Sequence, residues 1–167
     1  MNKTRQLTVL FAAALTLASC GWFSDKDEEL EPKELVDIKN SLNVKRIWST
    51  KLGGEAEYLL VGLRPATDGD NIFAASQDGN VTALSPANGK AVWKTKLEVE
   101  LSAGPGVGEG TVAVATKDGH IIALDTKTGA ERWRAYIGGE TLAQPLVKGE
   151  YVVVQSIDNR LQALSLF

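Results

Sequence analysis

Cys20 and His120 are the only cysteine and the only histidine of the chain, and this limits the chemistry that the protein could perform. A disulfide needs a second cysteine, and zinc sites use clusters of cysteine and histidine side chains. A Ser-His-Asp or Cys-His nucleophilic site would have to use His120. The composition therefore excludes an internal disulfide and a multi-histidine metal site.

Cys20 stands at the end of a segment that is typical of bacterial protein export. Lys3 and Arg5 precede residues 7–17, an apolar stretch that is too short to span a bilayer as a helix. The run Leu17-Ala18-Ser19-Cys20 resembles the lipobox, in which the cysteine is acylated and becomes the new N-terminus. An ordinary secretory signal followed by a chance cysteine is the alternative. We predict a signal peptide over residues 1–19 and lipid attachment at Cys20.

An acidic segment follows the cysteine. Residues 21–43 contain seven acidic side chains and three lysines, so they can bury little apolar surface and should stay extended. A coil of this length reaches roughly 25–30 Å, enough to hang a domain below a membrane surface. We therefore predict that residues 20–43 form a lipidated cysteine and a flexible tether. By analogy with lipoprotein sorting, Gly21 rather than aspartate after the cysteine favours the outer membrane.

Three aspartates recur at equal spacing and could be mistaken for a catalytic set. Asp78, Asp118 and Asp158 each open the phrase Asp-(Gly/Asn)-x-x-x-Ala-Leu. Asp-Gly between two apolar strands is a strong signal for a tight hairpin, because the turn needs positive φ angles, and asparagine tolerates that conformation better than other side chains. We interpret the aspartates, together with Gly79 and Gly119, as turn formers.

We also interpret His120 and the glycine-dense run as structural features and not as catalytic or binding sites. His120 directly follows such a turn, and Asn80 and Arg160 take the same place in the other copies, which predicts a solvent-facing site. The glycine-dense run 104–110 lacks a following helix, so we predict a strand and turn and not a phosphate-binding loop. We expect no catalytic residue, no cofactor and no metal ion.

Tryptophans mark a second recurring phrase. Gly89 and Gly129 each precede a tryptophan by four residues, Trp93 and Trp133, and Trp48 lies in a run similar to the one around Trp93. We interpret these indoles as wedges between neighbouring sheets.

A period of about 40 residues with strand-like content is typical of β-propeller blades, each a sheet of four antiparallel strands. The sequence predicts an all-β, incomplete propeller over residues 44–167. Its parts would be an outer, ring-closing strand over 44–52, a first blade over 53–97, a second over 98–137 and an unfinished third over 138–167. The net charge of −3 offers no basic surface for nucleic acid.

The expected strands follow from this period. In the second blade they span 103–107, 111–116, 120–124 and 131–137, and in the first blade 72–76, 80–84 and 91–97. In the third blade they span 142–147, 151–156 and 160–164, with no outer strand. We expect such a chain to be a marginal fold that exposes sheet edges and that associates or is degraded.

The phrase Ala-Leu-Asp-x-x-Thr-Gly-x-x-x-Trp, at 123–133, resembles the repeat of the quinoprotein (PQQ-type) propellers. Two functions share this repeat: PQQ-dependent dehydrogenases, and the BamB family of outer-membrane assembly lipoproteins. The lipobox, the acidic tether, Ile47-Trp48-Ser49-Thr50 and the run 139–147 resemble the BamB family in that order.

The resemblance implies a non-catalytic scaffold of about eight blades that assists the insertion of β-barrel proteins. The scaffold would be lipid-anchored in the outer membrane of a Gram-negative bacterium, facing the periplasm. Its partners would be the periplasmic POTRA domains of BamA and other BAM subunits, with contacts beyond Phe167 and no small-molecule substrate. The alternative is a fragment of a PQQ-dependent dehydrogenase, which would hold the quinone and a calcium ion.

Overall fold

The computed structural model describes residues 39, 41–54 and 62–167. The chain divides into two units, Met1–Asn43 and Val44–Phe167, and every strand that the structure describes lies in the second. Cys20, the expected signal peptide and most of the expected tether lie outside the described residues. Within the described part, no helix is long and apolar enough to cross a membrane.

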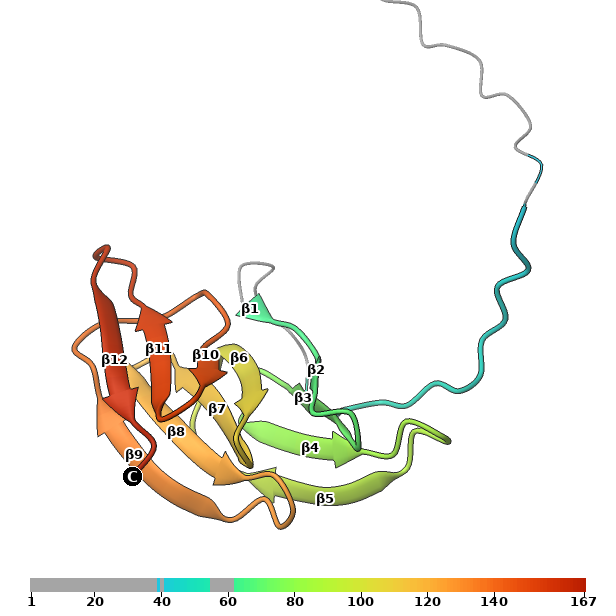
Figure 1. The fold of residues 1–167 in the computed structure, drawn as a ribbon, viewed down its shortest axis with the longest axis horizontal. Helices are drawn as coiled ribbons and strands as arrows, with labels where there is room; N and C mark the ends of the chain where they lie inside the picture. The colour runs from blue at the N-terminus through green and yellow to red at the C-terminus, as the bar shows by residue number, and fades with distance from the viewer. Residues whose placement is uncertain (1–38, 40, 55–61) are drawn as a thin grey trace, which may run out of the picture. The chain divides into compact units, whose positions relative to one another are not determined.

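Three sheets follow one another along the chain, as expected for propeller blades (Figure 1). In each, consecutive strands pair antiparallel in sequence order. The first contains β2 (Ala66–Thr67), β3 (Ile72–Ala75), β4 (Asn80–Leu84) and β5 (Ala91–Lys96). The second contains β6 (Leu101–Gly108), β7 (Thr111–Thr116), β8 (His120–Asp125) and β9 (Glu131–Tyr136), and the third contains β10 (Leu146–Lys148), β11 (Tyr151–Gln155) and β12 (Leu161–Ser165). The prediction of an all-β propeller fold is confirmed.

A short additional strand was not expected. β1 (Gly62–Leu63) pairs in parallel with β6, with Gly62 opposite Ala103 and Leu63 opposite Gly104. It gives the second sheet five strands, in the order β1-β6-β7-β8-β9. The chain of the first blade thus reaches across to the inner strand of the second.

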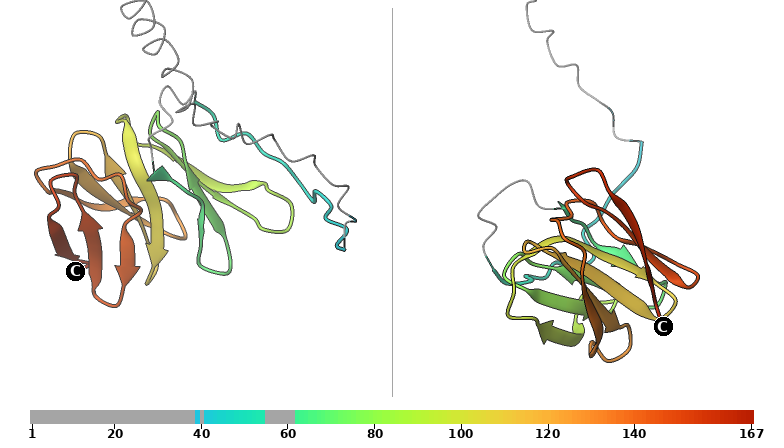
Figure 2. Two further views of the ribbon diagram at one scale, coloured as in Figure 1. Left: turned by 90° about the horizontal axis from the view of Figure 1, so that it is seen from above. Right: turned by 90° about the vertical axis from the view of Figure 1, so that its left-hand side faces the viewer.

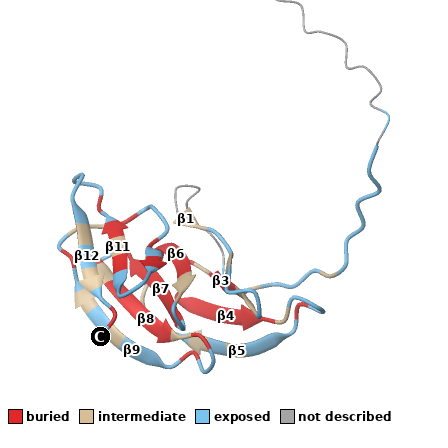
Figure 3. Ribbon diagram, viewed as in Figure 1, coloured by how far each residue is buried: buried red, intermediate tan, exposed pale blue. Residues whose placement is uncertain are grey.

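The sheets pack face to face and bury two cores (Figures 2 and 3). Phe73 and Val81 of the first sheet meet Val112 and Ile122 of the second. A second cluster joins the second sheet to the third, and it includes Ala113, Ala115, Ile121, Ile137, Val152 and Val154. The second sheet is therefore covered on both faces, and all six residues of β7 are buried.

The expected tight turns have the backbone conformation that their residues suggested. The φ angles are +90° at Gly79, +87° at Gly119 and +64° at Asn159. Each is the left-handed conformation that glycine, and after it asparagine, adopts at the lowest cost. The third copy therefore keeps the turn although it lacks the glycine.

Two expected strands differ from the structure. Residues 44–52 form no strand, because no strand of the described chain lies beside them to pair with. The inner strand expected over 142–147 begins only at Leu146. The residues before it are held by side chains instead: Ser102 Oγ donates to Thr141 O at 2.7 Å, and Gln144 Nε2 donates to Pro105 O at 2.5 Å.

Candidate functional site

Two tryptophans of the repeat, Trp48 and Trp93, each bind the turn of the blade that follows them. Trp48 Nε1 donates to Pro86 O, and Trp93 Nε1 donates to Thr126 O, both at 2.8 Å. Pro86 and Thr126 stand 40 residues apart, at the same place in the turn before the outer strand. The same contact is therefore made twice, although residues 44–52 form no strand.

The turn that receives each indole needs glycine. A Cβ added to Gly129 would lie 2.5 Å from Cε3 of Trp93, and a Cβ on Gly89 would lie 2.5 Å from Cε3 of Trp48. Both glycines also have positive φ angles, +71° and +68°. Each of these glycines thus lies under the tryptophan of the preceding copy of the repeat: Trp48 packs on Gly89, and Trp93 packs on Gly129.

We expect Gly129→Ala to lower the free energy of unfolding by about 2–4 kcal/mol, since backbone strain and overpacking both contribute. Gly138→Ala is the matched control, because Gly138 has φ +81° but nothing within 4 Å of an added Cβ. Strain alone should cost about 1–2 kcal/mol there. Urea denaturation measures both, and equal losses in the two variants would contradict the indole contact.

Trp133 differs from the other two repeat tryptophans. Its Nε1 is buried and has no hydrogen-bond partner. The residue that corresponds to Thr126 in the third copy is Leu166, and its carbonyl does not receive this bond. A buried unpaired N–H costs free energy, and the joint between the second and third blades lacks the hydrogen bond that Trp93 makes in the first.

The three aspartates accept hydrogen bonds within their own turns. Ser76 Oγ donates to Asp78 at 2.5 Å, and the hydroxyls of Thr116 and Ser156 donate in the same way to Asp118 and Asp158. A hydroxyl two residues before each aspartate is thus part of the turn.

Each aspartate also pairs with one or more nitrogen-bearing side chains. Asn80 Nδ2 lies 2.7 Å and Lys96 Nζ 3.2 Å from Asp78. His120 Nδ1 lies 3.1 Å from Asp118, and Arg160 Nε lies 2.8 Å from Asp158. The position after the turn therefore supplies a partner for the carboxylate in every copy.

These bonds lower the pKa of each carboxyl group. Donation from Ser76, helped by Asn80 and Lys96, lowers the pKa of Asp78 to about 2. Thr116 and then His120 lower the pKa of Asp118, and Ser156 and then Arg160 lower that of Asp158. A carboxylate with so low a pKa is a weak base at neutral pH, which favours turn formation over proton transfer.

We expect the carboxyl resonance of Asp78 to titrate near pH 2, and at a higher pH in Ser76→Ala, where Asn80 and Lys96 still hold the carboxylate. Because folding lowers this pKa, its contribution to stability is present above about pH 4 and is lost as the pH falls toward 2. NMR titration and denaturation at pH 7, 4 and 2 measure both effects. A midpoint near 3.8 in the unsubstituted protein would contradict the Ser76 bond.

The position after the turn is not solvent-facing in every copy. Asn80 is buried, so that part of the prediction is wrong, whereas the side chain of Arg160 is 68% exposed. The reason is the segment before the first blade: a Cβ on Gly53 would lie 3.8 Å from Asn80 Nδ2. His120 is half-buried, with its ring 5.1 Å from that of Tyr136.

The glycine-dense run belongs to β6 and allows a close approach of backbones. A Cβ on Gly106 would lie 1.9 Å from Pro145 O, and one on Gly108 would lie 2.5 Å from Val147 O. Only residues without a Cβ let the third blade approach the second this closely. These glycines therefore allow the second and third blades to pack against each other.

The inner strands border a shallow cavity of about 310 Å³, lined by Ala66, Thr67, Val107, Gln144, Pro145, Leu146 and Val147. Calcium prefers carboxylate and carbonyl oxygens, and this lining has no carboxylate. Among the described residues, no group of three or more histidine, cysteine, aspartate or glutamate side chains could hold a metal ion. The described lining therefore offers calcium no carboxylate.

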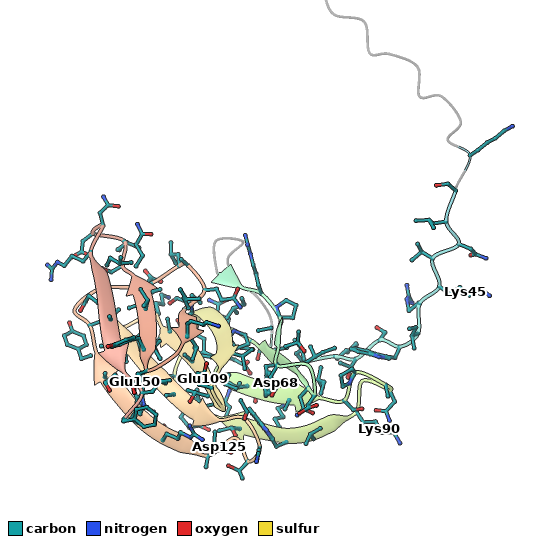
Figure 4. All side chains as sticks on the ribbon, viewed as in Figure 1. Lys45, Asp68, Lys90, Glu109, Asp125 and Glu150 are labelled. Carbon is teal, nitrogen blue, oxygen red and sulfur yellow. The ribbon has the colours of Figure 1, made fainter. Side chains whose placement is uncertain are left out.

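Turns carry acidic side chains at the opposite end of the strands from Asp78, Asp118 and Asp158. Figure 4 labels Asp68, Glu109, Asp125 and Glu150 there. Asp125 Oδ1 accepts from the backbone of Lys127 and Thr128 at 2.9 Å, and Arg132 lies 2.6 Å from Oδ2. Donation from Arg132 and then from Thr128 lowers the pKa of Asp125 to about 2, so Asp125 is a carboxylate at neutral pH and is fixed in its turn.

The family model described as outer membrane protein assembly factor BamB matches residues 35–98 and 77–166. The chain belongs to the BamB family. The BamB of Taylorella asinigenitalis is 34% identical over 114 residues, which are 68% of this chain and 29% of the relative. The BamB of Pseudomonas aeruginosa is 42% identical over 101 residues, 60% of this chain and 27% of the relative. The chain thus spans less than a third of the length of these relatives.

Solved structures agree with the fold. The crystal structure of BamB from Moraxella catarrhalis superposes with a TM-score of 0.58 at 29% identity, covering 62% of this chain and 32% of that one. A quinohemoprotein alcohol dehydrogenase from Pseudomonas putida superposes with a TM-score of 0.62 at 21% identity, covering 71% of this chain and 20% of that one. At that identity the second likeness shows a shared fold alone.

Proposed function

We propose that this chain is part of a lipid-anchored, non-catalytic scaffold that assists the assembly of β-barrel proteins in the outer membrane. The observation that carries the proposal is the BamB family match, which extends from residue 35 to residue 166. The curated relatives of this family are named as outer membrane protein assembly factors.

The contacts of the repeat residues support a scaffold. The recurring aspartates bind the hydroxyls and cations of their own turns, and two of the recurring indoles bind the turn of the next blade. These polar groups fix the shape of the molecule. A surface held in this way can present turns to partner proteins with little loss of conformational entropy.

The proposed layout follows the sequence. Residues 1–19 are a signal peptide, and residues 20–43 are the acylated Cys20 and a tether. The blades cover 53–97, 98–137 and 138–167. The protein hangs from the outer membrane into the periplasm, where it binds the POTRA domains of BamA and other BAM subunits.

A fragment of a PQQ-dependent dehydrogenase is the second candidate, because the repeat phrase at 123–133 resembles that class too. The lining of the inner-strand cavity opposes it, because the described residues there offer no carboxylate for calcium.

Affinity capture tests the proposal. A tagged full chain is expressed in its Gram-negative host, and solubilised membranes are captured on the tag and probed for BamA. Recovery of BamA with the tagged chain, and not with a tagged unrelated lipoprotein, is the expected result. Membrane-bound chain without BamA, together with alcohol-dependent dye reduction after addition of PQQ and calcium, would establish the dehydrogenase class instead.

A further inference from the structure

The two faces of an outer strand differ in character. Side chains of a strand point alternately to the two faces of its sheet. In β5, Trp93 and Thr95 donate hydrogen bonds to backbone carbonyls of the next blade. Val92, Lys94 and Lys96 belong to the other face and are exposed. One face of the strand therefore packs against a neighbour, and the other is open to solvent.

Cations gather on the open face in each copy of the repeat. Taking every second residue, this face reads Lys-Ile-Ser-Lys over 45–51, Lys-Val-Lys-Lys over 90–96 and Ala-Arg-Arg-Tyr over 130–136. Seven of these twelve residues are lysine or arginine and none is acidic, although the net charge of the chain is −3. We call these twelve residues the cationic face.

Neighbouring blades do not bury the cationic face. The sheet that contains β9 is covered on both sides by other sheets. The side chains of Arg132 and Arg134 are nevertheless 39% and 36% exposed, and Tyr136 is 68% exposed. The exposure of the cationic face is therefore a property of the repeat position and not of an uncovered sheet.

The unpaired charge of the cationic face lies on the side of the first blade. Arg132 and Arg134 already pair with carboxylates of their own blade, at 2.6 Å and 3.0 Å. Four lysines of the cationic face have no ion pair with a described residue: Lys45, Lys51, Lys90 and Lys94. Figure 4 labels two of them, Lys45 and Lys90, with side chains that extend away from the sheets. These lysines are free to bind an anionic surface.

Contacts hold residues 44–52 on the first blade, beside β5. Trp48 Nε1 donates to Pro86 O, in the turn before β5, at 2.8 Å. Just past the segment, a Cβ added to Gly53 would lie 3.8 Å from Lys94 Nζ. The four unpaired lysines therefore belong to one surface.

We propose that the cationic face of residues 44–52 and β5 docks on a membrane surface with anionic phospholipid headgroups. Ile47 is 85% and Val92 54% exposed between the lysines. Surfaces that lie on membranes combine cations with apolar side chains that enter the headgroup region. Lysines alone would fit an acidic protein equally well, and the interleaved apolar side chains favour the membrane.

The proposed lipid anchor brings this surface to a membrane. The tether ends at residue 43, so the cationic face begins with the first residues after it. A tethered surface meets its binding partner at a high effective concentration. Each lysine or arginine near an anionic membrane strengthens binding roughly fivefold, and salt weakens the attraction. In the choice of a membrane as the occupant, the proposal rests on the proposed function.

Lysine footprinting of the acylated chain tests the proposal. The chain is purified from the outer membrane and reconstituted into vesicles of phosphatidylcholine, or of equal parts phosphatidylcholine and phosphatidylglycerol. An amine-reactive acetylating reagent is added, and mass spectrometry follows each lysine. Lys127 and Lys148 are the matched controls, because both are exposed and neither belongs to the cationic face. No other protein is present, so the result does not depend on binding to BamA, and incorporation into the vesicles reports the anchor separately.

We expect Lys90 and Lys94 to react at least about fivefold more slowly in the anionic vesicles, with Lys127 and Lys148 unchanged. A high salt concentration should remove this protection. Equal rates of Lys90 and Lys94 in the two kinds of vesicle would overturn the membrane as the occupant and favour an acidic protein. Equal protection of the control lysines would also overturn the proposal, because the membrane would then not select the cationic face.

A charge-reversed variant tests whether the two segments act as one surface. Lys90→Glu with Lys94→Glu should abolish the protection of Lys45 and Lys51 in the anionic vesicles. Lys127→Glu with Lys148→Glu should leave that protection intact. All four substituted side chains are exposed, so the fold does not depend on them. Protection of Lys45 and Lys51 that survives the first variant would overturn the proposal that residues 44–52 and β5 form one docking surface.

Discussion

Trp93→Ala should lower the free energy of unfolding by about 3 kcal/mol, the low end of the range for truncating a large aromatic side chain. The low end is chosen because Trp93 is only partly buried. The indole contacts the core beside Phe73, whose ring lies 5.9 Å away, and it donates to Thr126 of the next blade. Small domains are stable by about 5–15 kcal/mol, so this one residue carries a large share of the total.

Two further variants separate packing from hydrogen bonding at Trp93. Trp93→Phe keeps an aromatic ring but leaves Thr126 O without its donor, so we expect a loss of about 1 kcal/mol. Tyr136→Ala truncates an aromatic ring that is 68% exposed and should cost far less than Trp93→Ala. Urea denaturation of residues 21–167 measures all three. If Trp93→Ala unfolded no more easily than Tyr136→Ala, the indole would not join the blades.

The turns and strands of the second blade were predictable because their signals are local. Asp118-Gly119 marks a hairpin, and the apolar runs on either side extend to the observed ends of β7 and β8 within one residue. The same holds for Asn80–Leu84, where expectation and structure coincide. Where the turn residues and the apolar pattern agree, a strand can be predicted without knowing which residues it contacts elsewhere in the chain.

The features that differ from the prediction depend on contacts with residues far away in the sequence. A local sequence pattern does not show such contacts. β1 exists because residues 62–63 meet β6, some forty residues further along the chain. The residues before Leu146 look like a strand but are held by Ser102 and Pro105 of the second blade. Residues 44–52 have the pattern of a strand and no neighbour to pair with.

The repeat positions were found for their spacing, but their roles required the structure. The spacing showed that Asp78, Asp118 and Asp158 are equivalent, and it did not show that a hydroxyl two residues earlier donates to each of them. Ser76, Thr116 and Ser156 recur at the same period and could have been noticed. Nothing in the pattern distinguished Trp133, whose unpaired Nε1 reflects the neighbouring blade.

Cys20→Ala should remove the protein from the membrane. We expect the thiol of Cys20 to carry the lipid, since this residue follows Leu17-Ala18-Ser19 and is the only cysteine of the chain. Each acyl methylene in a bilayer contributes about 0.8 kcal/mol, and two or more acyl chains anchor a protein stably. Loss of acylation should therefore shift the protein from the membrane to the soluble fraction.

Labelling cells with a clickable palmitate and separating inner and outer membranes measures this shift. Cys20→Ala combined with Ser24→Cys is the matched control, because it restores a thiol four residues beyond the lipobox. That variant should take up no label, whereas Ser19→Ala, which keeps a small residue before the cysteine, should take up as much as the unsubstituted chain. Label and outer-membrane location that survive Cys20→Ala would show that the lipid is attached to another residue and would contradict the lipobox prediction.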